Sequence, residues 1–98
     1  MVAIRLDDTT QQALERLITV AHADTGQSVA VANFLLAWHN ASENGGFDLT
    51  DLWGLDEHLV SACAVVFLWV ASHRAYPDEL GYGDQFQALW QQWRGRDA

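Results

Sequence analysis

Histidine, cysteine and carboxylate side chains are the groups in this chain that could bind a metal or take part in catalysis. His39 and Glu43 are spaced one helical turn apart, and His22 lies two residues before Asp24. A transition-metal site needs three or four such ligands at one point. The sequence contains no His-x-x-x-His pair and no second cysteine beside Cys63. We therefore predict neither a bound metal nor another cofactor.

Nucleophilic chemistry has equally little support. Cys63 lies in the middle of the most apolar stretch, where a thiol behaves as a small hydrophobic group with a raised pKa. The sequence shows no glycine-rich phosphate loop, no nucleophile elbow and no Ser/His/Asp spacing. We predict no catalytic residue, and hence a protein that is not an enzyme.

Paired carboxylates are the remaining catalytic possibility. Asp48 and Asp51 are three residues apart, which would place both on one side of a short helix for general acid–base work. However, acidic residues also favour helix N-termini. Because Asp48 and Asp56 stand where helices are expected to begin, capping explains most of this pairing.

The acidic segment, residues 43–57, is the strongest candidate for function. It holds five carboxylates and no basic residue, and it includes Phe47 and Trp53. One interpretation is a recognition surface; the other is that the acids cap helices while the aromatic rings point inward. For the first interpretation, the predicted partner-binding residues are Glu43, Asp48, Asp51, Trp53, Asp56 and Glu57.

Apolar periodicity predicts the helices that position this segment. The apolar residues fall at i, i+3, i+4 and i+7 in the first, second and last helices. The first helix begins near Thr9 and stops where Gly26 takes a left-handed conformation, and Ser28 caps the second. Asp56 caps the fourth and Asp84 the last. The expected ranges are 9–24, 28–42, a short turn at 48–53, 56–73 and 84–94.

The stretch 59–71 is apolar on all sides except for Ser61, so we expect it to be covered on most sides. A membrane span is the rival interpretation. Thirteen residues at about 1.5 Å each reach about 20 Å, short of the roughly 30 Å hydrocarbon core of a bilayer. We therefore predict a core helix and no membrane interaction.

The fold class that follows is all-α: a compact bundle of four main helices plus one short helix. Ninety-eight residues, half of them hydrophobic, fit a single domain spanning 1–98. No segment alternates long enough to demand a strand. Five tryptophans and four phenylalanines are expected to fill much of the core.

The charge balance limits the partners. Thirteen acidic residues face five arginines and no lysine, for a formal charge of −8. This argues against direct nucleic-acid binding, which depends on Lys and Arg, and predicts that a charged partner is basic. A single cysteine excludes an intramolecular disulfide, and no signal-peptide pattern is visible, so we expect a cytoplasmic protein.

The first forty residues resemble a ribbon-helix-helix DNA-binding module, with Ile4-Arg5-Leu6 as the strand and Thr25-Gly26-Gln27-Ser28 as the turn. We reject this resemblance. The stretch between Leu6 and Gly26 is about one helical turn too long, and the charge is wrong for phosphate contacts.

A second resemblance covers most of the chain. It is carried by segments 24–28, 31–38, 44–53 and 76–83, whose sequences are DTGQS, VANFLLAW, NGGFDLTDLW and YPDELGYG. These resemble an uncharacterised family of small all-α proteobacterial proteins often encoded on integrative elements, plasmids and prophages. The resemblance implies no assigned activity and no catalytic residues. It implies a setting in which accessory proteins include inhibitors of host defence, anti-CRISPR proteins among them.

The leading hypothesis is an acidic interaction domain that binds a basic surface of a host protein or nucleoprotein complex by placing carboxylates where phosphates would lie. The target under this hypothesis is a nucleic-acid-handling defence complex, inhibited in an anti-CRISPR-like manner. One alternative is a small-ligand-binding protein or hydrolytic enzyme that uses the acidic segment. The other is a structural module in which exposed aromatic residues drive homo-oligomerisation.

Overall fold

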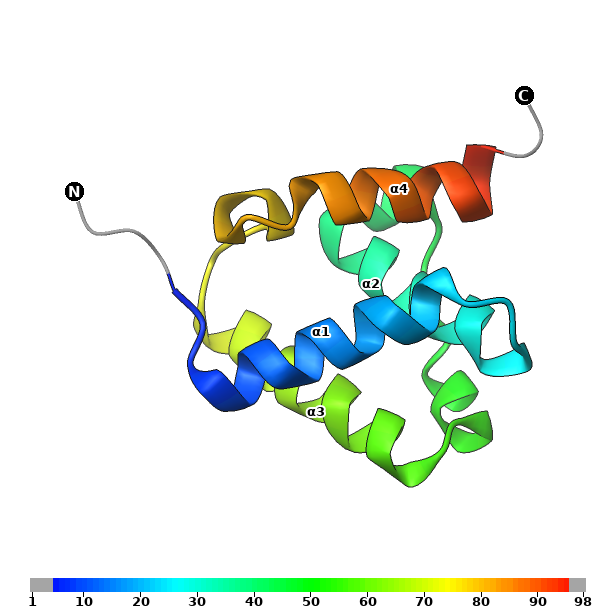
Figure 1. Cartoon of the computed structure of the whole chain (residues 1–98), viewed down its shortest axis with the longest axis horizontal. Coiled ribbons are helices and arrows are strands. Elements are labelled where there is room, and N and C mark those ends of the chain that lie inside the picture. Colours follow the sequence, from blue (N-terminus) through cyan, green and yellow to red (C-terminus); the bar gives the residue numbers. More distant parts are fainter. Residues whose placement is uncertain (1–4, 96–98) are drawn as a thin grey trace.

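The computed structural model describes residues 5–95, apart from the side chain of residue 40. Over this range the chain forms helices and no strand, which confirms the all-α prediction with four main helices (Figure 1). Two short 3₁₀ helices accompany them in the described range, one of which begins at Pro77. The elements are α1 (Asp8–His22), α2 (Gly26–Asn44), η1 (Leu49–Gly54), α3 (Glu57–Ser72), η2 (Pro77–Leu80) and α4 (Gly83–Arg94).

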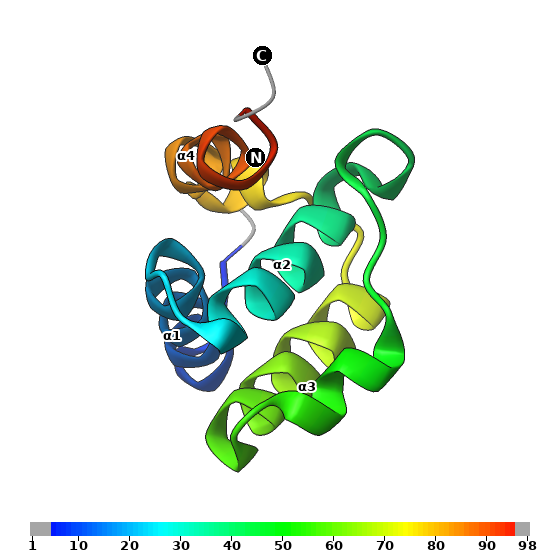
Figure 2. The ribbon, with the colours of Figure 1, turned by 90° about the vertical axis from the view of Figure 1, so that its right-hand side faces the viewer.

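The helix α1 holds the bundle together, because it packs against α2, α3 and α4. Figure 1 shows α4 on one side of α1 and α3 on the other. In Figure 2, α1 and α4 are seen end-on, while α2 and α3 slant across the view. Two further contacts complete the arrangement, with α4 packed on α2 and η1 beside α2. None of the described helices is both long and apolar enough to span a bilayer.

Leucines fill the centre of the core, contrary to the expectation that aromatic residues would. Of the aromatic side chains in the described range, Trp69 and Phe86 are buried. Trp38 lies at the edge, where its indole Nε1 donates to the carbonyl of Ala75 at 3.0 Å. The indole N–H needs a polar partner, and this favours a peripheral position. The largest apolar side chains with almost no exposure are Leu14, Leu17, Leu35, Leu36, Leu59, Leu89, Val31 and Val66.

The apolar helix α3 is covered on one face only, so the expectation that it is covered on most sides is wrong. Val66 and Leu59 are buried against the core. On the other face, the side chains of Phe67 and Leu68 are 59% and 65% exposed. The reason is that α3 packs mainly against one neighbour, α1, and one helix covers one face.

Two predicted caps at the start of α2 are wrong. Thr25, not Ser28, is the N-cap, and the two residues form a capping box. The Thr25 hydroxyl accepts from the Ser28 backbone N–H, and the Ser28 hydroxyl accepts from the Thr25 backbone N–H. Gly26 does not end α1 in a left-handed conformation. It is the first residue of α2, and α1 ends at His22.

Of the three other predicted caps, Asp48 is confirmed, whereas Asp56 and Asp84 differ from the prediction. Asp48 caps η1 as expected. Asp56 occupies the N-cap position of α3, but its carboxylate makes no capping hydrogen bond. Asp84 lies inside the first turn of α4, whose N-cap is Tyr82.

Candidate functional site

The acidic segment runs along one side of the molecule, from the end of α2 through η1 to the first turn of α3, coloured green in Figure 2. All six residues predicted to bind a partner are exposed: Glu43, Asp48, Asp51, Trp53, Asp56 and Glu57. The structure thus places every one of them where a partner can reach it.

The last turn of α4 anchors the start of this segment. The Arg94 guanidinium donates from Nε to the carbonyl of Asn44 and from Nη2 to Oδ1 of Asn33, both at 2.6 Å. A cation at the C-terminus of α2 also complements the helix dipole. The chain then turns at Gly45, whose φ of 89° favours glycine. A β-carbon at position 45 would lie 3.5 Å from Arg94 Nη2.

Asp48 fixes the start of η1. Its carboxylate oxygen Oδ1 accepts from the Thr50 hydroxyl at 2.8 Å and from the Thr50 backbone N–H at 3.1 Å. These two hydrogen bonds, the hydroxyl bond first, lower the pKa of Asp48, because they favour the ionised form. Asp48 therefore caps a helix and still presents a negative charge at the surface.

The two aromatic residues of the segment point in different directions. The Phe47 ring packs edge-on against the Phe34 ring with centroids 5.3 Å apart, so Phe47 is partly buried. Trp53 is 85% exposed, and Leu49 in the same 3₁₀ helix is 69% exposed. We name Asp48, Leu49, Asp51 and Trp53 the η1 surface. The interpretation that the aromatic rings of the segment point inward is therefore correct for Phe47 and wrong for Trp53.

A shallow groove of about 370 Å³ separates the η1 surface from α2. Asp51 borders the groove from η1, and Asn33 borders it from α2. The remaining lining is small or apolar: Gly26, Val29, Ala30, Thr50, Gly54 and Leu55. The groove gives a partner side chain a recess beside a carboxylate.

The far end of the acidic segment is fixed by a side chain from α2. Gln27 Oε1 accepts from the Asp56 backbone N–H at 2.7 Å, and Gln27 Nε2 donates to the Asp56 carboxylate at 3.2 Å. This pairing replaces the capping bond that Asp56 was expected to make. Glu57 follows in the first turn of α3.

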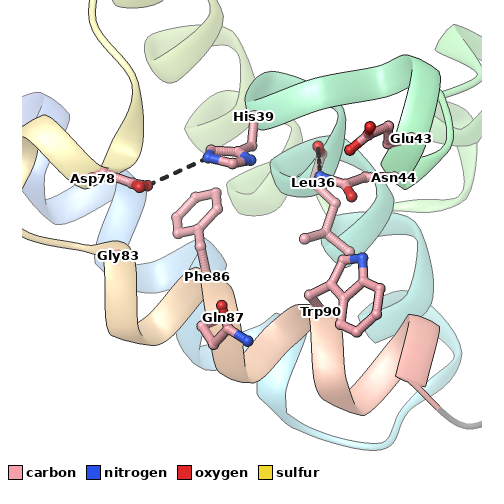
Figure 3. Close-up of a pocket in the computed structure, with 9 residues that line it drawn as sticks. All are labelled: Leu36, His39, Glu43, Asn44, Asp78, Gly83, Phe86, Gln87 and Trp90. Atoms are coloured by element: carbon pink, nitrogen blue, oxygen red, sulfur yellow. Dashed lines mark hydrogen bonds and ion pairs between the residues drawn. The ribbon is translucent and has the colours of Figure 1, made fainter.

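Glu43 lies apart from the η1 surface. It borders a different cleft, of about 340 Å³, between α2, η2 and α4 (Figure 3). Ten residues of α2 separate Glu43 from Asn33 in the η1 groove, which corresponds to about 15 Å along the helix. In this cleft His39 Nε2 lies 3.5 Å from the Asp78 carboxylate, with Trp90 on the facing helix.

The pairing of His39 with Asp78 could not be predicted from the sequence, because no local spacing connects residues on α2 and η2. Both side chains are exposed. No group of three metal-ligating side chains comes together among the residues that the structure describes. Cys63 is buried, and burial raises the pKa of its thiol to about 11, so it is a poor nucleophile near neutral pH.

Fold and surface together define a small acidic helical domain. The chain belongs to a family of unknown function, DUF7673, whose model matches residues 11–94. This confirms the resemblance to an uncharacterised family. No curated protein and no solved structure gives a significant match.

Proposed function

We propose that this chain is a non-enzymatic interaction domain whose η1 surface binds a basic surface on a partner protein. The observation that carries the proposal is the 85% exposure of Trp53, which lies in the sequence between Asp51 and Asp56. A tryptophan exposed to water contributes little to its own fold. At protein interfaces the same side chain is among the commonest sources of binding energy.

The charge of the segment supports a basic partner. Residues 43–57 contain five carboxylates and no histidine, lysine or arginine, in a chain of formal charge −8. Such a field attracts positive surfaces and raises association rates at low salt. Four of the five carboxylates, those of Asp48, Asp51, Asp56 and Glu57, lie within ten residues of one another in the sequence and are all exposed, so that they can take the place of phosphates.

The most fitting partner chemistry is therefore a protein surface that otherwise binds phosphates. Within this proposal, the partner is a nucleic-acid-handling defence complex of a host cell, and the chain inhibits it in an anti-CRISPR-like manner. The resemblance to proteins of mobile elements supports this choice, and such an encounter takes place in the cytoplasm. Direct binding to nucleic acid is not expected, because the charge has the wrong sign.

Catalysis by the acidic segment is the weaker proposal. A general acid works best with a pKa near the operating pH, whereas hydrogen bonds lower the pKa of Asp48 below its ordinary value. Asp48 and Asp51 are also open to water, which weakens any electrostatic effect on a substrate.

The test is purification of tagged chain from its native host, followed by kinetics with any protein that copurifies. We expect Trp53→Ala to weaken binding by about 2 kcal/mol, or roughly 30-fold, if the side chain is an interface anchor. The fold should tolerate this change. Only 15% of the side chain is buried, about 40 Å² of an aromatic surface of some 250 Å², which is worth about 1 kcal/mol.

The matched control is Trp90→Ala, a partly exposed tryptophan on α4 outside the η1 surface. It should leave binding unchanged. Asp48→Asn with Asp51→Asn should slow association and flatten its salt dependence, since both charges are removed while Asn can still cap η1. Equal binding by wild type and Trp53→Ala, with an unchanged salt dependence in the Asp variant, would refute the proposal.

A further inference from the structure

The outer face of α3 is an unpartnered apolar surface distinct from the η1 surface. Phe67 and Leu68 are more than half exposed, and Ala64 and Ala71 beside them are exposed as well. The opposite face of the same helix carries Val66 into the core. Large apolar side chains on a helix face that the rest of the fold leaves uncovered indicate an interaction surface.

The spacing on this face is that of a coiled-coil seam. The residues Glu57, Ser61, Ala64, Leu68 and Ala71 follow at intervals of four, three, four and three, and all five are exposed. We name them the α3 seam. Alternation of three and four keeps side chains on one narrow stripe along a helix. Between residues 58 and 73 the helix carries no formally charged side chain.

We propose that the α3 seam pairs with the α3 seam of a second copy of this chain, with the two helices antiparallel about a twofold axis. Antiparallel pairing places Leu68 of each copy opposite Ala64 of the other, so a large side chain meets a small one. Small residues also let the helices approach closely. Phe67, at the edge of the seam, lies near the axis and faces the same residue of the second copy.

The charges at the two ends of α3 favour this orientation. Asp56 and Glu57 stand at its start, and Arg74 is exposed just beyond its end. Antiparallel pairing brings Glu57 of one copy to Arg74 of the other, twice per dimer. Neither residue makes an ion pair within residues 5–95. Parallel pairing would instead set Glu57 against Glu57 in a chain of formal charge −8.

A second copy fits this surface better than a lipid bilayer does. The chain has no lysine, and its net negative charge opposes approach to anionic lipids. The seam is short, because the 16 residues of α3 extend about 24 Å. We therefore expect an interface at the small end of the specific range, with a dissociation constant in the micromolar region.

The experiment is sedimentation equilibrium of the purified chain over low micromolar to submillimolar concentrations. Wild type is expected to pass from monomer to dimer. Leu68→Glu, which puts a carboxylate into the seam, is expected to raise the dissociation constant at least about tenfold. Leu49→Glu is the matched control, because Leu49 is equally exposed on η1, and it should dimerise as wild type does. Thermal unfolding by circular dichroism checks that both variants stay folded.

Two charge reversals test the orientation. Glu57→Arg and Arg74→Glu should each weaken self-association, because each creates two like-charge contacts per dimer. A mixture of the two variant chains should associate more strongly than either alone, because both contacts regain opposite charges.

A wild type that stays monomeric, or a dimer unaffected by Leu68→Glu, overturns the proposal. If the mixture associates no more strongly than either variant alone, the antiparallel arrangement is overturned. Trp53→Ala should leave dimerisation intact, which separates this proposal from the η1 surface.

Discussion

Arg94 is the side chain whose loss should reveal how α4 holds the acidic segment in place. Its guanidinium joins the C-terminal carbonyl of α2, at Asn44, to the amide oxygen of Asn33. Arg94→Met keeps most of the apolar stem and removes every donor. The variant leaves the Asn44 carbonyl at a buried helix end without this partner.

The expected cost follows from the two hydrogen bonds. Each bond from a charged donor is worth about 1.5–3 kcal/mol, and bonds from one group are not additive. Because the Arg94 side chain is only half-buried, water compensates part of the loss. We therefore expect Arg94→Met to lower the free energy of unfolding by about 2–4 kcal/mol. For a domain of this size that corresponds to a fall in Tm of roughly 10–25 °C.

The assay is urea and thermal unfolding followed by circular dichroism. Arg94→Lys should recover about half of the lost stability. The lysine ammonium keeps the charge, but it lacks the forked guanidinium that donates to two acceptors at once. Arg16→Met is the matched control; Arg16 is exposed on α1, and its loss should cost less than about 0.5 kcal/mol. In a double-mutant cycle, Arg94→Met and Asn33→Ala should couple. A Tm within about 4 °C of wild type for Arg94→Met would show that these two hydrogen bonds do not hold the end of α2 in place.

The remaining predictions concern α3 and its thiol. Val66→Asp should cost about 4 kcal/mol or more, since Val66 is buried and a carboxylate has no partner there, whereas Val29→Asp, at an exposed site on α2, should cost little in the same unfolding assay. Cys63 should resist thiol reagents at pH 8 until the chain unfolds. Burial raises its pKa from 9.0 to about 11, so the stability that it contributes is full below pH 9 and is lost as the pH rises through about 11. Cys63→Ala should reduce this alkaline loss, and Tyr82→Phe should reduce the separate loss at higher pH, because the pKa of Tyr82 is raised to about 12.

Periodicity was sufficient to predict the main helices. Leu14, Leu17, Ile18 and Ala21 form the predicted stripe of the first helix, and all four are buried. Such a stripe depends only on helix geometry and on the exclusion of apolar groups from water, and both act locally. The cap at Asp48 was predictable for the same reason, since its partner Thr50 is two residues away.

Helix ends were harder to predict where several capping residues are adjacent. Thr25 and Ser28 are both good N-caps, and the choice between them depends on packing. Ser28 is fully buried, which suits a residue inside the capping box at the third position of the helix. Gly26 led to a wrong prediction in the same region, because glycine often ends a helix but also occurs in the first turn of one.

Contacts between distant segments could not be predicted from the sequence. Gln27 with Asp56, Arg94 with Asn33 and His39 with Asp78 each join residues on different helices, and none has a local motif. The exposure of the candidate site depends on the same tertiary arrangement. The sequence shows that the acidic segment contains two aromatic residues, but only the packing of Phe47 on Phe34 decides which of them points outward.

Some apolar side chains build the core, and the ones that remain exposed form the two proposed surfaces. Leucines complete the core, so the fold does not need the exposed rings of Trp53 and Phe67 or the exposed side chain of Leu68. Apolar groups left in water promote association, and a formal charge of −8 opposes indiscriminate association between copies. Contacts that place opposite charges around the apolar groups reduce this repulsion. In the two proposals, the carboxylates near Trp53 in the sequence select a basic partner, and the acid and the base at the two ends of the α3 seam select an antiparallel copy.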